Sequence, residues 1–215
     1  MNVYTQPPVL TADRSLPRKS LVMMIRAGEM EGIAQPHLPE GYAFRQYQPG
    51  DMRYWARITT IVQEYDTQEA AESAFSRRFL SQEDALRGRC VFVIAPDGTP
   101  VATVMAWMLE EDGVRYGRVH WVCVDPAHQG QGLGRAIVLW ALNKLKDLEP
   151  GRDVYLDTQT WSHKAIGLYL RLGFHPVREG HPVLRKANEY TATADILRTV
   201  LPDAVMQLFL DRSLD

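Results

Sequence analysis

The sequence predicts an α/β fold: a mixed sheet, most of it antiparallel, flanked by helices and extended at both ends. Residues 90–124 contain three runs rich in β-branched and aromatic residues, separated by the turns Pro96–Gly98 and Asp112–Gly113, which is typical of an antiparallel meander. Residues 116–158 then form a strand, a helix and a strand, and such a crossover normally makes its two strands parallel. The two patterns together predict the mixed sheet.

Composition and charge narrow the class of protein. The 215 residues are 46% apolar and 23% charged, which is ordinary for one globular domain with extensions. The net charge is −2 and no long basic run occurs, so nucleic-acid binding is disfavoured. The longest apolar stretch near the start, residues 21–25, is too short for a signal-peptide core or a membrane span. Two cysteines, Cys90 and Cys123, lie apart in apolar runs, which fits a reducing cytoplasm.

The region before residue 90 begins with a proline-containing arm, residues 1–40, that has no sustained period. Asp51 follows Pro49 and Gly50 and is a candidate cap for the first helix. The elements expected here are a short strand at 21–26, a strand at 42–47, and helices at about 51–64 and 67–80.

The remaining elements continue to the end of the chain. Apolar residues at helical spacing predict the helix after Gly132, and Ser162 and Gly173 are candidate ends of the next one. The expected elements are strands at 90–95, 101–109 and 116–124, a helix at 132–147, a strand at 154–158, a helix at 162–172, a strand at 174–177, an edge strand at 183–186, and a helix from 192 interrupted by Pro202. We expect a domain at 41–180 and an extension at 181–215.

A glycine-rich loop lies between the predicted strand at 116–124 and the helix that follows it. Gly130, Gly132 and Gly134 occupy alternate positions, so backbone N–H groups can face an anion without side-chain obstruction. The start of the helix adds about half a positive charge, which suits a pyrophosphate, and Arg135 offers a further contact. Glycines alone could equally serve a tight strand-to-helix turn.

Two common phosphate-binding motifs do not match this loop. The dinucleotide motif needs GxGxxG in a βαβ unit, whereas the spacing here is GxGxG after an antiparallel meander. The P-loop needs a Lys and a Ser or Thr directly after its last glycine, and Arg135 and Ala136 stand there.

The loop and two flanking segments resemble the GNAT superfamily of acyl-CoA-dependent N-acyltransferases. Gln129, Gly132 and Gly134 match its pattern of Gln or Arg, two residues, Gly, one residue, and Gly or Ala. Val122–Pro126 is similar to the family's V-x-V-x-P, and Ala165–Phe174 to its A-x-x-L-Y-x-x-x-G-F. Two motifs in the right order and at the right distance are far more specific than either alone.

The resemblance implies how coenzyme A would bind. Main-chain groups of Val122 and Val124 would pair with the pantetheine arm, where the strands at 116–124 and 154–158 part. Ser162 stands where many members have Asn, so that cofactor contact would depend on a hydroxyl. The pyrophosphate would be bound by the loop residues Gln129, Gly130, Gln131, Gly132, Leu133, Gly134 and Arg135.

Two residues are candidates for catalysis. The resemblance implies that the Tyr169 hydroxyl protonates the departing thiolate, although Tyr169 also lies on the apolar face of its helix and could be a core aromatic. Strict alternation places His120 on the same face as Val122 and Val124, where family members often project a base, and a half-buried structural histidine is the alternative. Backbone N–H groups at 122–124, which include that of Cys123, are candidate oxyanion donors.

Further expectations concern a possible metal site and a cluster of acidic residues. Because their separation is odd, His120 and Cys123 are expected on opposite strand faces, so we predict no metal site, and Cys123 is expected to be a small buried residue. An acidic cluster spans the two early helices and is either a solvated face or an attraction for a cationic amine. It consists of Glu64, Asp66, Glu69 and Glu72.

These observations predict a cytoplasmic N-acetyltransferase that moves an acetyl group from acetyl-CoA to a primary amine by direct attack in a ternary complex. The expected partner is a small-molecule or peptide amine, with no nucleic acid, membrane or metal involved, and a homodimer is left open. Two alternatives stand beside it: a non-catalytic acyl-CoA-binding regulatory module, and a different acceptor such as a hydroxyl or a protein N-terminus.

Overall fold

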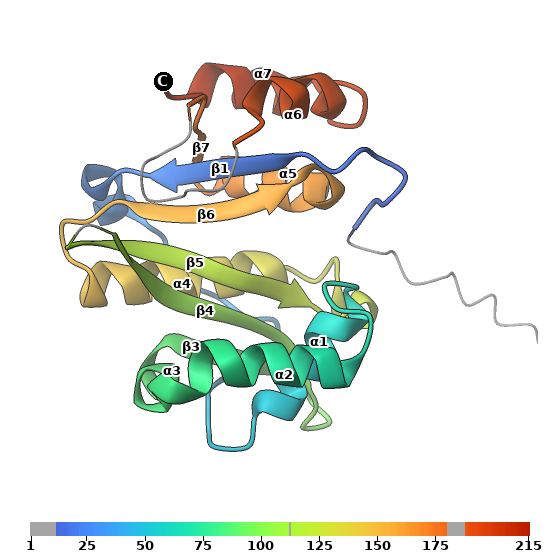
Figure 1. Ribbon diagram of the computed structural model, residues 1–215, viewed down its shortest axis with the longest axis vertical. Helices are drawn as coiled ribbons and strands as arrows, with labels where there is room; N and C mark the ends of the chain where they lie inside the picture. Colours follow the sequence, from blue (N-terminus) through green and yellow to red (C-terminus); the bar gives the residue numbers. More distant parts are fainter. Residues whose placement is uncertain (1–11, 112, 180–187) are drawn as a thin grey trace, which may run out of the picture.

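A single mixed sheet forms the centre of the molecule (Figure 1). The computed structural model describes residues 12–111, 113–179 and 188–215. Within these residues, β5 and β6 are parallel and every other neighbouring pair is antiparallel, as the sequence predicts. In sheet order the strands are β2 (Ala43–Gln46), β3 (Cys90–Ile94), β4 (Pro100–Glu111), β5 (Val114–Val124), β6 (Val154–Gln159), β1 (Ser20–Ile25) and β7 (His175–Pro176).

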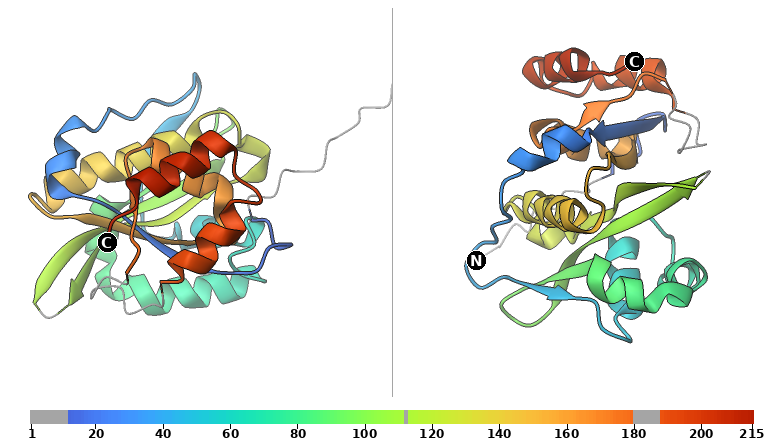
Figure 2. Two further views of the ribbon diagram at one scale, coloured as in Figure 1. Left: turned by 90° about the horizontal axis from the view of Figure 1, so that it is seen from above. Right: turned by 90° about the vertical axis from the view of Figure 1, so that its left-hand side faces the viewer.

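Helices cover both faces of the sheet (Figures 1 and 2). One buried cluster joins the sheet to α1 (Met52–Ile61), α2 (Gln68–Phe79) and α3 (Glu83–Arg89). A second, larger cluster joins it to α4 (Leu133–Leu148), α5 (His163–Arg171), α6 (Tyr190–Leu197) and α7 (Asp203–Arg212). No helix in the described ranges is long and apolar enough to cross a membrane.

The strand expected near the start of the chain is an inner strand of the sheet. β1 pairs along its whole length with β6, from Ser20 opposite Gln159 to Ile25 opposite Val154, and β7 lies on its other edge. Its side chains are buried on both faces, which explains a continuous apolar run without alternation. β1 therefore belongs to the sheet of the domain, although it lies before the domain boundary expected at residue 40.

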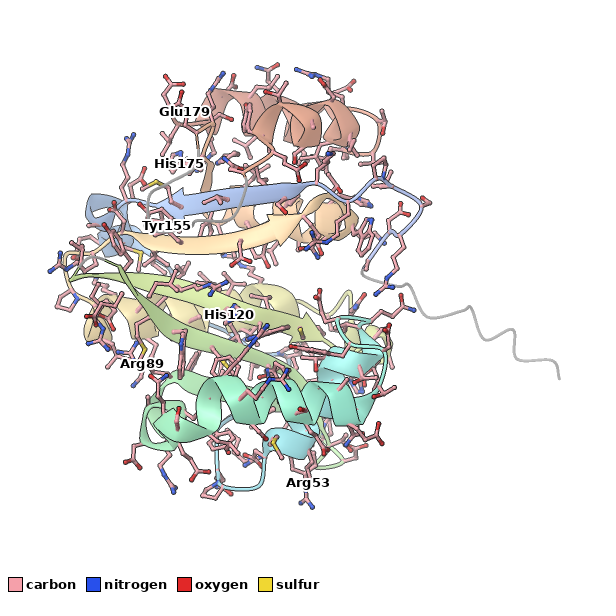
Figure 3. The ribbon with its side chains drawn as sticks, in the orientation of Figure 1. Arg53, Arg89, His120, Tyr155, His175 and Glu179 are labelled. Carbon is pink, nitrogen blue, oxygen red and sulfur yellow. The ribbon has the colours of Figure 1, made fainter. Side chains whose placement is uncertain are left out.

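Several other elements differ from the expectations. The short helix α3 is not predicted by the sequence; it ends at Arg89, whose buried guanidinium donates to Glu149 Oε1 at 2.5 Å (Figure 3). Asp51 and Ser162 stand at helix starts, but neither side chain makes a capping hydrogen bond. The predicted interruption at Pro202 is confirmed by the break between α6 and α7, whereas the expected strand at 183–186 lies outside the described residues.

Strands β5 and β6 pair over a short distance only. Their register joins Gly117 to Val154 and Arg118 to Tyr155, and the strands part beyond this point. The β5 main chain after Arg118 therefore has an edge toward β6 that the sheet does not use. This parting is where the sequence places the candidate site.

Candidate active site

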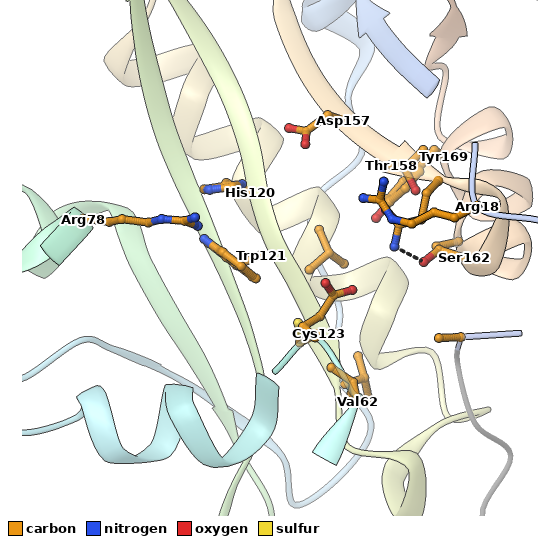
Figure 4. A pocket seen from close by; sticks show the side chains of 16 residues that line it. Arg18, Val62, Arg78, His120, Trp121, Cys123, Asp157, Thr158, Ser162 and Tyr169 are labelled. Carbon is orange, nitrogen blue, oxygen red and sulfur yellow. Dashed lines mark hydrogen bonds between the residues drawn. The ribbon is translucent and has the colours of Figure 1, made fainter. Parts of the chain in front are cut away.

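A cavity of about 240 Å³ lies where β5 and β6 part (Figure 4). Its wall comes from both strands, from α5, from the α1–α2 region and from the segment before β1. The lining residues are Ala12, Arg18, Val62, Glu64, Arg78, His120, Trp121, Val122, Cys123, Val124, Asp157, Thr158, Gln159, Ser162, Ala165 and Tyr169.

The cavity brings together six of the residues expected from the sequence, namely His120, Val122, Cys123, Val124, Ser162 and Tyr169. The loop residues 129–135 do not line it and lie instead at the start of α4. The two parts are tied together, because Gln129 Nε2 donates to the Val124 carbonyl oxygen at 3.0 Å.

The loop has the backbone geometry of an anion site. Gly130 and Gly132 have φ values of +75° and +86°, which residues with a Cβ rarely adopt, and Gly132 is the N-cap of α4. A Cβ built on Gly132 would meet nothing within 4 Å, so the space above it is open. The first N–H groups of α4 lack acceptors within the helix, and the helix dipole favours negative charge there. Leu133 is buried, so it can offer a ligand only its N–H group.

A β-bulge interrupts the pairing of β4 with β5 next to the cavity. Thr103 pairs with Cys123 and Met105 with His120, so two residues of β5 stand opposite one residue of β4. Trp121 sits in the bulge with a φ of +54°. The bulge breaks the alternation of side chains along β5.

The bulge corrects the expected orientation of His120. Its ring contacts Phe79 of α2, with centroids 6.2 Å apart, whereas Val122 and Val124 pack with the cluster on the α4 face (Figure 3). His120 therefore does not share a face with Val122 and Val124, because the extra residue in the bulge shifts the alternation by one position.

The same shift corrects the expectation for Cys123. Thr103 and Met105 share a face of β4, so their partners Cys123 and His120 share a face of β5. The odd separation of Cys123 and His120 in the sequence wrongly predicts opposite faces, because the bulge lies between them. Cys123 is buried, and burial raises the pKa of its thiol well above the ordinary value, as expected for a small core residue. The described residues contain no group of three or more His, Cys, Asp or Glu side chains that could hold a metal ion.

Tyr169 combines a packed ring with a place in the cavity. It is 6% exposed and its ring meets that of Phe174 edge-on, with centroids 5.7 Å apart. Burial raises the pKa of its hydroxyl, and the nearby acidic groups Cys123, Glu64 and Asp157 act in the same direction. A tyrosine hydroxyl is protonated at neutral pH at its ordinary pKa of about 10, and the upward shift keeps it protonated while making it a weaker acid.

Glu64 is a site residue that sequence reasoning did not separate from its neighbours. Of the acidic cluster it alone is among the residues that line the cavity, because the turn at Gln63, with a φ of +64°, follows directly after α1. Loss of surrounding water raises the pKa of Glu64, while a hydrogen bond from Gln159 and the charge of Arg18 partly oppose that shift. No sequence pattern distinguishes Glu64 from Asp66, Glu69 and Glu72.

The segment before β1 closes one side of the cavity. Trp161 Nε1 donates to the Leu16 carbonyl oxygen at 2.7 Å, and the Asp13 N–H donates to the Trp161 carbonyl oxygen at 2.8 Å. Arg14 reaches across to the carbonyl oxygen of Gln63. Arg18 follows in this segment and extends into the cavity (Figure 4).

Comparison with known proteins agrees with this geometry. A family model described as "Acetyltransferase (GNAT) family" matches residues 55–174. A mycothiol acetyltransferase of Actinosynnema mirum is 32% identical over 159 residues, covering 73% of this chain and 52% of that protein. One from Kytococcus sedentarius is 30% identical over 183 residues, covering 81% of this chain and 61% of that protein. The chain thus spans about half to three fifths of these curated relatives.

Two solved structures support the fold. A GCN5-related N-acetyltransferase from Sphaerobacter thermophilus aligns with a TM-score of 0.57 at 22% identity, over 74% of this chain and 48% of that chain. A tandem GNAT protein from the clavulanic acid biosynthesis pathway aligns with a TM-score of 0.55 at 19% identity. These likenesses confirm the predicted mixed α/β fold.

Proposed function

The chain belongs to the GNAT acetyltransferase family, and from that premise we propose that it transfers the acetyl group of acetyl-CoA to a primary amine. The observation that carries the proposal is the cavity between the parted strands β5 and β6, joined through Gln129 to the start of α4. The start of α4 would bind the phosphates of the ligand, and the cavity would hold its reactive end.

The residues present fit coenzyme A. Open space above Gly132 and the N–H groups of the first α4 turn suit the pyrophosphate, and exposed Arg135 adds a positive charge. The β5 edge at Val122 and Val124, which β6 does not pair, suits the amide groups of the pantetheine arm. Ser162 lines the cavity and offers a hydroxyl from the start of α5.

The proposed reaction is a direct attack in a ternary complex. The amine nitrogen bonds to the thioester carbonyl carbon, and backbone N–H groups at 122–124, fixed by the strand, stabilise the negative charge on the oxygen. The carbon–sulfur bond then breaks and the thiolate takes the Tyr169 proton. His120 is the proposed acceptor of the proton lost by the amine, directly or through water, from its position beside Phe79 and Trp121.

The class of acceptor and the compartment are also proposals. The names of the relatives refer to mycothiol, which supports a small-molecule amine as acceptor here. Both cysteines are free and buried, which supports a reducing cytoplasm. The alternative of a non-catalytic acyl-CoA-binding module predicts ligand binding without any acyl transfer.

The proposed function predicts selective stabilisation by acetyl-CoA. A ligand present at 100 times its Kd, and bound only by the folded state, stabilises that state by about 2.7 kcal/mol. For a chain of this size the melting temperature should rise by roughly 5–10 °C. NADH and ATP at the same concentration should have little effect, and equal shifts from all three would remove the coenzyme A assignment.

Release of CoA thiol from acetyl-CoA, followed over a panel of amines, separates the enzyme from the binding module. Amine-dependent release supports the enzyme. Stabilisation by acetyl-CoA without release on any amine supports the module.

A further inference from the structure

We infer that the acceptor carries an anionic group beside its amine, and that Arg78 and the Trp121 indole N–H hold this group on the α2 side of the cavity. The inference rests on the proposed function and specifies the class of its acceptor. The matching chemistry is that of a small amino acid or an amino phosphate.

Arg78 is a cation in the cavity wall without an ion pair in the described part of the chain. It comes from α2, near its end, and extends toward the cavity, where its guanidinium carbon lies 5.9 Å from the centre of the Trp121 ring (Figure 4). The cavity carboxylate of Asp157 pairs with Arg118 instead. Arg78 is exposed enough to meet a ligand, and a guanidinium presents a fork of donors that matches a carboxylate or a phosphate.

The second observation is a buried donor beside that cation. Trp121 Nε1 is inaccessible to water and has no hydrogen-bond acceptor, and in Figure 4 the indole nitrogen lies next to the Arg78 guanidinium. An unsatisfied buried donor costs about 1–3 kcal/mol, and Arg78 cannot relieve it because it too only donates. Because Nε1 is covered, an anionic group reaches both donors only once a covering side chain moves aside, and it would then satisfy both.

The bulge explains why the indole faces this way. The positive φ of Trp121 turns its side chain onto the α2 face, where its ring stacks on Tyr65 with centroids 5.7 Å apart and meets Trp55 edge-on at 4.8 Å. These aromatic contacts hold the indole in place, so the direction of its N–H group is fixed before a ligand arrives. A fixed donor discriminates between ligands better than a mobile one.

Glu64 supplies the complementary charge. It lines the same cavity, and it lies close enough to Cys123 and Tyr169 to perturb the pKa of both groups. An ammonium group at Glu64 would therefore lie near the end of β5, where the thioester is expected. With the ammonium at Glu64 and the anion at Arg78, both charges of a zwitterion have partners.

The test measures binding in the presence of CoA, which prevents turnover. Isothermal titration would compare L-amino acids with their carboxamides, and phosphoethanolamine with ethanolamine, so that each pair differs in its anionic group. The acid or phosphate should bind roughly 10- to 100-fold more tightly than its partner, as expected for a charge-assisted contact. A preference within the amino-acid pairs alone would identify a carboxylate, and one within the phosphate pair alone a phosphate.

Arg78→Ala should abolish this preference while leaving acetyl-CoA affinity unchanged. Arg77→Ala is the matched control, because Arg77 directly precedes Arg78 on α2, is exposed, and does not line the cavity. Its guanidinium donates to Ser73 Oγ at 2.6 Å. Trp121→Phe keeps an aromatic ring, removes the donor, and should reduce the preference by a few fold.

Equal responses of the wild type to both members of every pair, including no response to either, would overturn the inference. So would an Arg78→Ala protein that keeps the preference. An anion preference in a wild type that transfers no acetyl group would instead reject the proposed function and leave this binding assignment standing.

Discussion

Replacing Tyr169 with phenylalanine should lower kcat by a factor on the order of 10²–10⁴, the usual contribution of one general acid. Phenylalanine keeps the ring and its contact with Phe174, so folding and acetyl-CoA affinity should change little. The lower end of the range applies if the thiolate leaves readily without a proton, since the thiol of free cysteine has a pKa near 8.5. Single-turnover acetyl transfer measures the chemical step directly.

The matched control for this substitution is Tyr190→Phe on α6. The Tyr190 hydroxyl has a polar partner, Ser213 Oγ at 2.8 Å, and Tyr190 lies outside the cavity wall. Tyr190→Phe should therefore keep the wild-type rate. If Tyr169→Phe also kept the wild-type rate with normal binding, Tyr169 would be a core aromatic and the reaction would need another acid.

Substitution of Gly132 by valine should abolish the stabilisation by acetyl-CoA, through a loss of affinity of roughly 100-fold or more. The φ of +86° costs a residue with a Cβ about 1–2 kcal/mol, and a β-branched side chain more. The added atoms would also fill the open space through which the pyrophosphate must approach the start of α4. Both effects act on the loop and spare the core.

Gly151→Val controls for the backbone strain alone. Gly151 follows α4 at its other end, has a φ of +68°, and is likewise surrounded by open space. Its valine variant should lose stability in the absence of ligand but keep the full rise in melting temperature with acetyl-CoA. If Gly132→Val folded and also kept that rise, the loop would have a structural role only.

The backbone gives a physical reason for the difference between two glycines of the loop. A Cβ on Gly134 would lie 3.5 Å from Leu168 Cδ2, an ordinary contact, and Gly134 has no positive φ. The family pattern has Gly at the position of Gly132 and Gly or Ala at that of Gly134, and the backbone agrees: Gly132 needs glycine for its conformation, whereas Gly134 needs only a small side chain.

Much of the fold was predictable because local patterns carry it. The meander follows from its turns and β-branched runs, and the crossover at 116–158 determines that β5 and β6 are parallel. The glycine loop and Tyr169 were predictable because each belongs to a short motif with fixed spacing. The inner position of β1 was not predictable, because the strand pairs with residues 129 to 139 positions away.

The orientation of His120 and the positions of Glu64 and Arg78 in the cavity wall had no local signal in the sequence. A one-residue bulge at Trp121 reverses the expected side of the strand, and nothing in the run from Val119 to Val124 indicates it. Arg78 is one of two consecutive arginines on α2, and only the tertiary structure shows that it, rather than Arg77, lines the cavity.

The place of β1 in the sheet also affects how the protein can be made. Ser20 can pair with Gln159 only after Gln159 has been synthesised. At rates of about 5–20 residues per second, this takes roughly 7–28 s after the synthesis of Ser20. During that time the run Leu21–Ile25 has no β6 to pair with and can associate with chaperones or with other nascent chains. β7 pairs with β1 and not with β6, so β7 can complete the sheet only after β1 has docked on the β6 edge.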